Sequence, residues 1–515
     1  MKNKKQSSLK VWNLLSGIVA LLLLGCEGWA FWRLIRLAVL PGKFLAILIG
    51  VAAVITVLLL VMMFPKVGRH QKKKGTGRRI TAYLLSGVIA AAAALGGMAL
   101  SKLNQTFDTI TQSPTVSAYV GVYVRSDDPA QEIGDASGYT FAVTDSYDAE
   151  HSRATVDHLS QLWNAPVQTE SFPSVFAMVD ALRDGGVQAM ILNEAYLSVL
   201  ETVDGYTDFR ESFRQLYQDT VTTDQIPTTA PVTEPEEAET EPVETTEPED
   251  PHTAPFLAYL SGSDTRSYML AQSRSDVNIL AVVNPETRQI LLVNTPRDYY
   301  IPNPAYGGSN DKLTHCGLNG PENSAKALGD LYGQKVTYTA QINFTGFETL
   351  IDSIGGITIY SDYDDGVFLR AGENHMDGEQ ALNFARDRHD YAGGDNARGQ
   401  HQMMVIKAVV DKLVSGSIIK NYSSILDSLQ GMFVTSMPSE RISELIKMQL
   451  EDMKPWNVMS YAVTGTGGSD IPAAMYPLYA YVMYPNMDTV EQASDLMDRV
   501  LHDEILTPED LQPAA

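Results

Sequence analysis

The chain has 515 residues, of which 44% are hydrophobic, and a formal net charge of −24. This length allows several domains, and the acidic excess argues against a nucleic-acid partner, because such partners need a basic surface. Cys26 and Cys316 are the only cysteines, so no disulfide framework is expected.

Residues 1–104 are predicted to form a membrane region with three transmembrane helices, at about 11–32, 44–64 and 80–100. Each apolar stretch is about 20 residues long, which is enough to cross the hydrocarbon core of a bilayer. Lysines and arginines precede the first stretch and separate the second from the third, and such loops stay in the cytoplasm. The chain therefore crosses three times, and everything after about Ser101 is expected outside the cell.

The sequence Leu-Leu-Gly-Cys at 23–26 resembles a bacterial lipoprotein cleavage site. The alternative, a cysteine inside a membrane helix, is the preferred interpretation. An exported chain without disulfides suits a bacterial surface better than a eukaryotic secretory route.

Residues 118–217 alternate between strand-like and helix-like runs and predict a small α/β accessory domain with a parallel sheet. Its role is left open between a spacer, a partner contact and a ligand site. Residues 218–255 are rich in proline, threonine and glutamate, so we expect an extended linker.

The last domain, 256–515, places charged residues at predicted strand ends. Strands are expected at 256–260, 277–283 and 289–295, the last two forming a hairpin, with further strands at 336–344 and 351–359. Ligand sites of α/β sheets commonly lie at strand ends. The charged residues there are Asp264, Arg266, Arg274, Asp276, Arg297 and Asp298.

A second cluster of basic residues lies in 381–402, with the sequence ALNFARDRHDYAGGDNARGQHQ. In extended backbone, Arg386 and Arg388 would share one face. On a helix, Arg398 and Gln402 would share another. Guanidinium groups bind phosphate oxygens in pairs, so the cluster is either a phosphate clamp or an ordinary basic surface. Asp264 and Asp276 could hold Mg²⁺, with Mn²⁺ as the alternative, against phosphate oxygens.

These motifs occur in a characteristic order: SGSDTR at 261–266, RSD at 274–276, PRD at 296–298, HMDGEQALNFARDRH at 375–389 and GGDNAR at 393–398. Together they resemble the LytR-CpsA-Psr family of cell-wall assembly enzymes, over about 256–505. The resemblance implies an α/β/α fold with a central mixed sheet. It also implies transfer of a glycan 1-phosphate from a polyprenyl diphosphate carrier to peptidoglycan, as in the attachment of wall teichoic acid or capsule.

The resemblance also implies roles for individual residues. Asp264 and Asp276 take the metal and diphosphate role. Apart from the resemblance, the acceptor hydroxyl must lose a proton as it attacks, and Asp298 or Asp264 could accept that proton. Many members carry an arginine where this chain has His401. The diphosphate-binding residues implied by the resemblance are Arg274, Arg297, Lys312, Arg386, Arg388, Arg398 and Gln402.

An apolar tunnel for the isoprenoid tail is expected from the strands at 277–283, 289–293, 336–344 and 351–359, which could equally be plain core. Two other functions stay open: a polyprenyl-diphosphate hydrolase with the same site, and a non-enzymatic surface scaffold that binds lipid carriers. The expected location is the cell membrane of a bacterium of the Gram-positive type, with the C-terminal domains extracytoplasmic.

Overall fold

The protein is described from a computed structural model, which covers residues 2–64, 72–111, 117–144, 148–222, 254–263, 265, 270–387, 395–413, 425 and 428–512. The chain divides into two compact units. The first joins Met1–Thr109 with Pro438–Lys454, and the second joins Ile110–Met437 with Pro455–Ala515.

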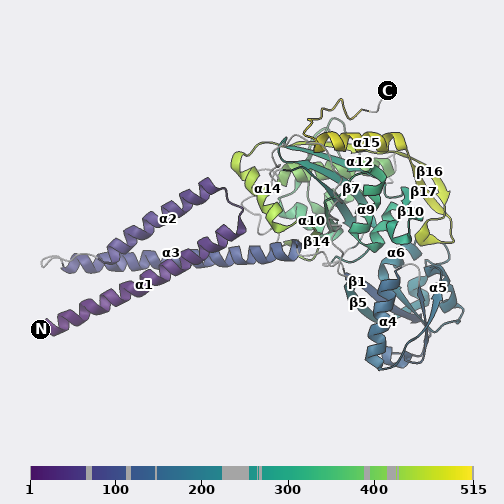
Figure 1. Ribbon diagram of the computed structural model, residues 1–515, viewed down its shortest axis with the longest axis horizontal. Coiled ribbons are helices and arrows are strands. Elements are labelled where there is room, and N and C mark those ends of the chain that lie inside the picture. Colours follow the sequence, from purple (N-terminus) through teal and green to yellow (C-terminus); the bar gives the residue numbers. More distant parts are fainter. Residues whose placement is uncertain are drawn as a thin grey trace, which may run out of the picture. The chain divides into compact units, whose positions relative to one another are not determined.

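The first unit contains the helices α1 (Lys2–Leu37), α2 (Gly42–Met63) and α3 (Lys72–Thr111), drawn in purple to blue in Figure 1. Among the described residues, three helices are long and apolar enough to cross a membrane, over Val11–Leu37, Gly42–Met63 and Gly77–Thr111. The three predicted apolar helices are therefore confirmed, and Cys26 lies within the first. The unit also includes α14 (Ser439–Asp452), where the carbonyl of Glu451 accepts a hydrogen bond of 2.9 Å from Lys43 Nζ.

The accessory domain has a mixed sheet with the strand order β3-β2-β4-β1-β5. Strand β2 is parallel to β3 and β4, but β1 is antiparallel to β4 and β5. The expected parallel sheet is therefore wrong, because β1 runs antiparallel to both of its neighbours. Strand β5 was not expected, and it extends past the predicted end of the domain at residue 217. The strands are β1 (Ser117–Arg125), β2 (Thr140–Thr144), β3 (Gln168–Phe172), β4 (Ala189–Asn193) and β5 (Phe213–Thr222).

Helices cover both faces of this sheet, and their apolar residues, which recur with helical periodicity, pack against it. Leu159 of α4 packs on one face with Phe141 and Val122, and Val179 and Leu182 of α5 belong to the core on the other. The helices are η1 (Ile133–Ala136), α4 (Ala149–Trp163), α5 (Val175–Arg183), η2 (Glu194–Tyr196), α6 (Leu197–Leu200) and α7 (Phe209–Ser212).

The accessory domain shares a hydrophobic core with the C-terminal domain, although the linker separates them in sequence. Tyr196 and Leu200 belong to one buried cluster with Tyr306, Leu318 and Met475. The Tyr196 and Tyr306 hydroxyls are 2.7 Å apart and buried. The predicted linker lies outside the described residues from 223 to 253.

The central sheet of the C-terminal domain has the order β14-β11-β6-β7-β8-β15. Strands β6, β7 and β8 are antiparallel, whereas β11 and β15 add parallel strands at the two sides, so the sheet is mixed as expected. The strands are β6 (Phe256–Ser263), β7 (Ser275–Asn284), β8 (Gln289–Asn294), β11 (Tyr338–Asn343), β14 (Phe433–Thr435) and β15 (Asn457–Ala462).

Helices pack on both faces of this sheet because buried strands carry apolar side chains on both sides. Leu280 and Leu291 belong to the core under α9 (Pro321–Tyr332) and α15 (Met487–Leu501). Ile279 and Leu292 face the other way, toward Met403 of α12 (Asp395–Leu413). Helices α10 (Phe344–Ser353) and α11 (Gly378–Arg386) continue the α12 layer. The domain is therefore α/β/α.

One local expectation was wrong. The stretch 351–359 begins in α10 and becomes a strand only at β12 (Ile357–Ser361), which pairs with β13 (Gly372–Met376) outside the central sheet. The last helix, α15, is capped by the Asn486 side chain, which accepts from the Asp488 N–H. The remaining elements are β9 (Tyr300–Pro302), η3 (Pro304–Tyr306), β10 (Asn310–Lys312), α8 (Leu313–Cys316), η4 (Gly317–Asn319), β16 (Gly465–Asp470), η6 (Ala473–Met475) and β17 (Ala480–Pro485).

Candidate active site

The β7–β8 hairpin brings the charged strand ends together. Ile279 of β7 pairs with Asn294 of β8, so the start of β7 lies beside the end of β8. Asp276 is at that start, and Arg297 and Asp298 follow that end. The hairpin predicted from sequence therefore explains why a carboxylate and a guanidinium that are 21 residues apart meet.

Arg297 lies between two carboxylates. Its Nη1 donates to Asp276 Oδ1 at 2.7 Å, and its Nε is 3.6 Å from Asp298 Oδ2. Lys312 Nζ is 3.3 Å from Asp298 Oδ1. Thr314 Oγ1 also donates to Asp276 Oδ1, at 3.5 Å. The result is a continuous chain of opposite charges, with Asp276 at one end and Lys312 at the other.

Asp276 is held in its ionised form. Burial raises the pKa of Asp276, but the positive charges of Arg297 and Arg274 outweigh burial and hold that pKa below its ordinary value, with a further contribution from Arg398. An anion bound beside Asp276 would experience the same positive charges.

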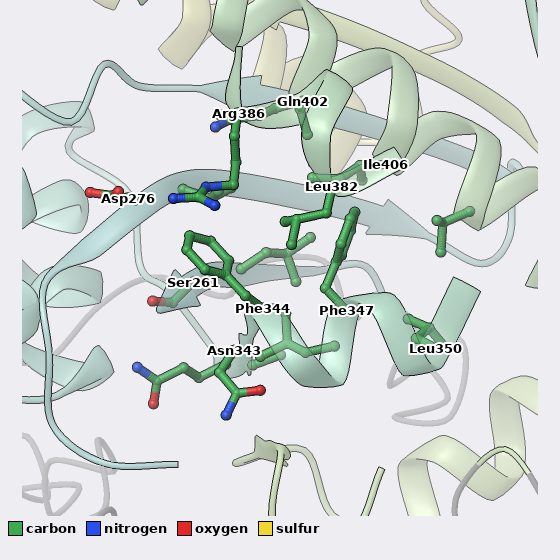
Figure 2. Close-up of a pocket in the computed structure, with 18 of the residues that line it drawn as sticks. Ser261, Asp276, Asn343, Phe344, Phe347, Leu350, Leu382, Arg386, Gln402 and Ile406 are labelled. Atoms are coloured by element: carbon green, nitrogen blue, oxygen red, sulfur yellow. The ribbon is translucent and has the colours of Figure 1, made fainter. Parts of the chain in front are cut away.

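Arg386 is the last residue of α11 rather than part of an extended strand, so the expected pairing with Arg388 through strand alternation does not apply to it. Its guanidinium lies over the ring of Phe344, 4.3 Å from the ring centroid. Figure 2 shows this arrangement, with Asp276 at the same end of the pocket. The aromatic face supports the cation while its donors stay available.

Arg398 and Gln402 lie one turn apart on α12, and both are buried, which confirms the expected shared face. Gly399 allows this helix to approach β8 closely, because a Cβ there would lie 2.6 Å from Asn294 Nδ2. His401 points elsewhere and stacks on Phe384, with ring centroids 4.2 Å apart. Burial lowers the pKa of His401, which disfavours a positive charge at this position.

A cavity of about 480 Å³ extends from these charges into the α12 layer of the domain. Asp276, Arg386, Arg398 and Gln402 line its polar end. Figure 2 shows Phe347, Leu382 and Ile406 along the apolar part, which also has Leu260, Val277, Ile342, Leu350, Val409, Val410 and Leu413 in its walls. The tunnel was expected to be lined by strands, and Val277 and Ile342 do line the cavity. Helices α10, α11 and α12 supply much of the remaining lining, whereas Leu291 and Val293 of β8 belong to the core instead.

A smaller cavity of about 170 Å³ meets the same charges from another side. Asp276, Arg398 and Gln402 line both cavities, and Arg297, Asn294 and Thr464 line only the smaller one. Three of the predicted residues, Asp276, Arg398 and Gln402, therefore lie between the larger cavity and the smaller one.

Three of the charged residues singled out from the sequence, Asp264, Arg266 and Arg388, lie outside the described residues. Asp298 is buried between Arg297 and Lys312, and the described walls of the two cavities do not include it. Within the described part of the chain, no three His, Cys, Asp or Glu side chains are grouped as metal ligands.

Sequence reasoning missed Phe344 and Thr314. Phe344 begins α10 and has no charge or motif to mark it. Thr314 could have been found, since it lies two residues after Lys312, which was already a candidate.

Comparison with known proteins identifies the family. A model of the LytR_cpsA_psr family matches residues 221–492, which include every site residue discussed above. The chain belongs to this family, so the resemblance seen in its motifs is confirmed.

Two curated relatives are transferases by name. A polyisoprenyl-teichoic acid–peptidoglycan teichoic acid transferase, TagU of Enterococcus faecalis, is 31% identical over 196 residues, covering 37% of this chain and 64% of the relative. TagT of Bacillus subtilis, of the same description, is 32% identical over 195 residues, covering 35% and 59%. The matches thus span less than two thirds of these relatives.

Solved structures give similar matches. A structure of TagT bound to LI-WTA is 25% identical, with a TM-score of 0.40, and covers 50% of this chain and 96% of that one. The Lin1025 protein from Listeria innocua is 28% identical, with a TM-score of 0.39, and covers 48% and 99%.

Proposed function

We propose that this protein transfers a glycan 1-phosphate from a polyprenyl diphosphate carrier to peptidoglycan. The observation that carries the proposal is the pair of cavities that meet at Asp276, Arg398 and Gln402. A polyprenyl diphosphate has an apolar tail and a compact, highly charged head, and the larger cavity offers both environments in one continuous space. Family membership and the names of the relatives support the same reaction.

In this proposal the tail enters between α10 and α12, and the diphosphate lies against the arginines. Arg386 and Arg398 bind the phosphate adjoining the lipid, since both line the tail cavity. Arg297 binds the phosphate that carries the glycan, from the smaller cavity. Arg274, Arg388 and Lys312 add positive charge around the diphosphate.

The reaction forms one bond and breaks one. The acceptor hydroxyl oxygen attacks the phosphorus that bears the glycan, and the bond from that phosphorus to the bridging oxygen breaks. Polyprenyl monophosphate leaves, and the glycan stays joined to the acceptor through a phosphodiester. Phosphoryl transfer depends mainly on positioning and on neutralising charge, which is what fixed guanidinium groups provide.

The roles of the two described aspartates differ. Asp276 has a depressed pKa, so it is a weak base and serves charge balance. Asp298 is a positioning residue that holds Arg297 and Lys312. Asp264 therefore remains the candidate that accepts the proton of the acceptor hydroxyl.

Asp276 would hold a Mg²⁺ or Mn²⁺ ion, because it is an ionised carboxylate at the polar end of the larger cavity. The resemblance implies Asp264, which lies outside the described residues, as the second ligand. One or two carboxylates plus phosphate oxygens are the usual protein ligands of Mg²⁺. The ion would supply neutralisation of the diphosphate charge.

The proposed location is a bacterial cell membrane of the Gram-positive type, with the catalytic domain outside. Three apolar helices support a membrane anchor. The basic residues before the first helix and between the second and third support an outward topology for the domains that follow.

A product assay tests the function. Full-length protein in detergent is given polyprenyl diphosphate-linked glycan, Mg²⁺ and a peptidoglycan oligomer. The proposal predicts polyprenyl monophosphate and an equal amount of glycan joined to the oligomer. Release of glycan phosphate into water at the same rate with and without the oligomer would instead identify a hydrolase. Binding of the lipid without any product would identify a scaffold.

A further inference from the structure

A buried hydrogen bond joins the accessory domain to the segment that carries Arg274 and Asp276. Asn193 Nδ2 donates to Gln272 Oε1 at 3.0 Å, although the two residues are 79 apart in the sequence. Asn193 is 2% exposed and Gln272 is 8% exposed. Asn193 is the last residue of β4, whereas Gln272 lies two residues before Arg274. The bond therefore connects a strand of one domain to the proposed donor site of the other.

The Asn193 amide is fixed on the side of the accessory domain. Its Oδ1 accepts from the N–H of Ala195 at 3.1 Å and so caps η2. Its Nδ2 also donates to Asp148 Oδ1 at 3.1 Å, and the same carboxylate oxygen contacts His151 Nδ1. An amide that bonds in this way through both its oxygen and its nitrogen has one preferred orientation. Asn193 can therefore act as a rigid support for Gln272.

The segment 272–276 is also held from within the C-terminal domain. The Ser273 and Ser263 hydroxyl oxygens are 2.6 Å apart. Gly317 of η4 packs tightly against the segment, because a Cβ there would lie 2.7 Å from the backbone nitrogen of Ser275. The accessory domain thus holds the first residue of a segment whose next residues pack against the C-terminal domain.

The residues that follow Gln272 carry charges of the site. Arg274 is one of the cations that we place around the diphosphate, and Asp276 lines both cavities. A displacement of about 1 Å caused by a change far from the chemistry can alter a rate by roughly a hundredfold. A fixed position for Gln272 is therefore a means of fixing the charges that meet the donor.

We propose that Asn193 of the accessory domain is a positioning residue for the proposed reaction. Through Gln272 it holds the segment that places Arg274 and Asp276 against the diphosphate of the donor. The accessory domain then contributes to the donor site and is more than a spacer. This inference rests on the proposed function and adds to it the contribution of a domain that holds none of the predicted site residues.

Kinetics of the full-length protein in detergent test the inference. Gln272→Met keeps the length of the side chain but removes the acceptor of the Asn193 bond, and Asn193→Ala removes the donor. Each variant should raise the KM for polyprenyl diphosphate-linked glycan by roughly tenfold, the order expected when a buried hydrogen-bonding group loses its partner. The KM for the peptidoglycan oligomer should stay unchanged.

The alternative is that the bond only stabilises the packing of the two domains. A loss of stability alone would leave part of the protein unfolded, which lowers the apparent kcat but changes neither KM. An unchanged donor KM in Gln272→Met would therefore overturn the inference. Gln272→Met decides alone if Asn193→Ala does not fold.

The double variant Asn193→Ala/Gln272→Met tests whether the two residues act through their shared bond. If they do, the double variant should raise the donor KM no further than the single variants do. Effects that multiply would show independent roles and would also overturn the inference. The matched control is Ser174→Ala. Ser174 is buried in the accessory domain and caps α5 by accepting from the Ala177 N–H at 3.2 Å, so its loss should leave the donor KM unchanged.

The outcome is separable from that of the proposed function, because equilibrium binding of the same lipid-linked glycan is measured as well. If the unchanged protein performs transfer and Gln272→Met binds the donor equally tightly, the inference fails and the function stands. If the unchanged protein binds the donor without transferring it, and Gln272→Met weakens that binding, the function fails and the positioning role stands. No donor binding by the unchanged protein would contradict both.

Discussion

Asp276 offsets part of the positive charge of the arginines in the site, and its lowered pKa predicts how the stability of the protein depends on pH. The pKa of Asp276 is lower in the folded protein than its ordinary value of about 3.9. A depressed pKa stabilises the folded state above the ordinary pKa, and this stabilisation is lost as pH falls through the folded pKa.

Asp276→Asn should therefore lower the free energy of unfolding at neutral pH, and the difference from the unchanged protein should shrink below about pH 4. Denaturant unfolding of the full chain at a series of pH values measures this difference. A difference that stays constant down to pH 2 would contradict the charge account.

Phe344 supports Arg386 by a cation–π contact, and this contact can be tested apart from the volume of the ring. Phe344→Leu keeps an apolar side chain but removes the aromatic face. A contact of about 1 kcal/mol corresponds to roughly a fivefold increase in the KM for the lipid donor. The control is Phe347→Leu. Phe347 lines the same cavity, but no cation lies over its ring among the described residues. Equal effects of the two variants would mean that only volume matters.

Helix α12 connects the charged end of the cavity to its apolar end. Arg398 and Gln402 lie in its first half, and Ile406, Val409 and Leu413 follow on the same side of the helix. The spacing of three and four residues places all of them along one stripe. If the donor binds as proposed, this one helix positions both its diphosphate and its tail.

Ile406→Trp should obstruct the tail cavity without removing a charge. We expect binding of long polyprenyl diphosphates to fall by about 1–3 kcal/mol, the usual range for overpacking, while donors with a very short prenyl chain bind as before. Lys407→Trp is the matched control, because Lys407 is exposed on the next position of the helix and pairs with Asp411. Equal loss for short and long donors would place the tail elsewhere.

Sequence reasoning succeeded where one local pattern determines the structure. The apolar stretches gave the membrane helices, and the four-residue spacing gave the shared face of Arg398 and Gln402. It failed where a local signal was overlooked. Arg386 ends α11, which begins eight residues before it at Gly378, after the capping box of Asp377 and Gln380. Strand β5 was read as the start of a linker because its polar residues carry no clear alternation.

At the scale of the whole molecule, the shared core explains how the accessory domain contributes. Tyr306 of the C-terminal domain is buried among accessory-domain residues, and Met475 lies in the same cluster, just before the segment that leads to β17. The accessory domain therefore supports both the β9–β10 pair and the segment that enters the β16–β17 hairpin. The sequence does not reveal this shared core, because the linker between the two domains carries no information about which of their surfaces pack together.

Tyr306→Ala should therefore destabilise both α/β domains together. Large-to-small changes of a buried aromatic residue cost about 3–5 kcal/mol. Hydrogen exchange of the full chain should show faster exchange in β4 and in β9 alike. Leu162→Ala, at a side chain exposed on α4, should change neither. Faster exchange confined to the catalytic domain would show that the two domains unfold separately.

The central claim is that a polyprenyl diphosphate lies with its phosphates between the two cavities and its tail beside α12. Photocrosslinking of the full-length protein with a polyprenyl diphosphate that carries a photoreactive group on its tail, followed by peptide mapping, tests this most directly. The account predicts crosslinks in α10 and α12, at Phe347, Leu350, Ile406 or Val409, and their loss when unlabelled donor competes. Crosslinks confined to α9, α15 or the opposite face of the central sheet would contradict it.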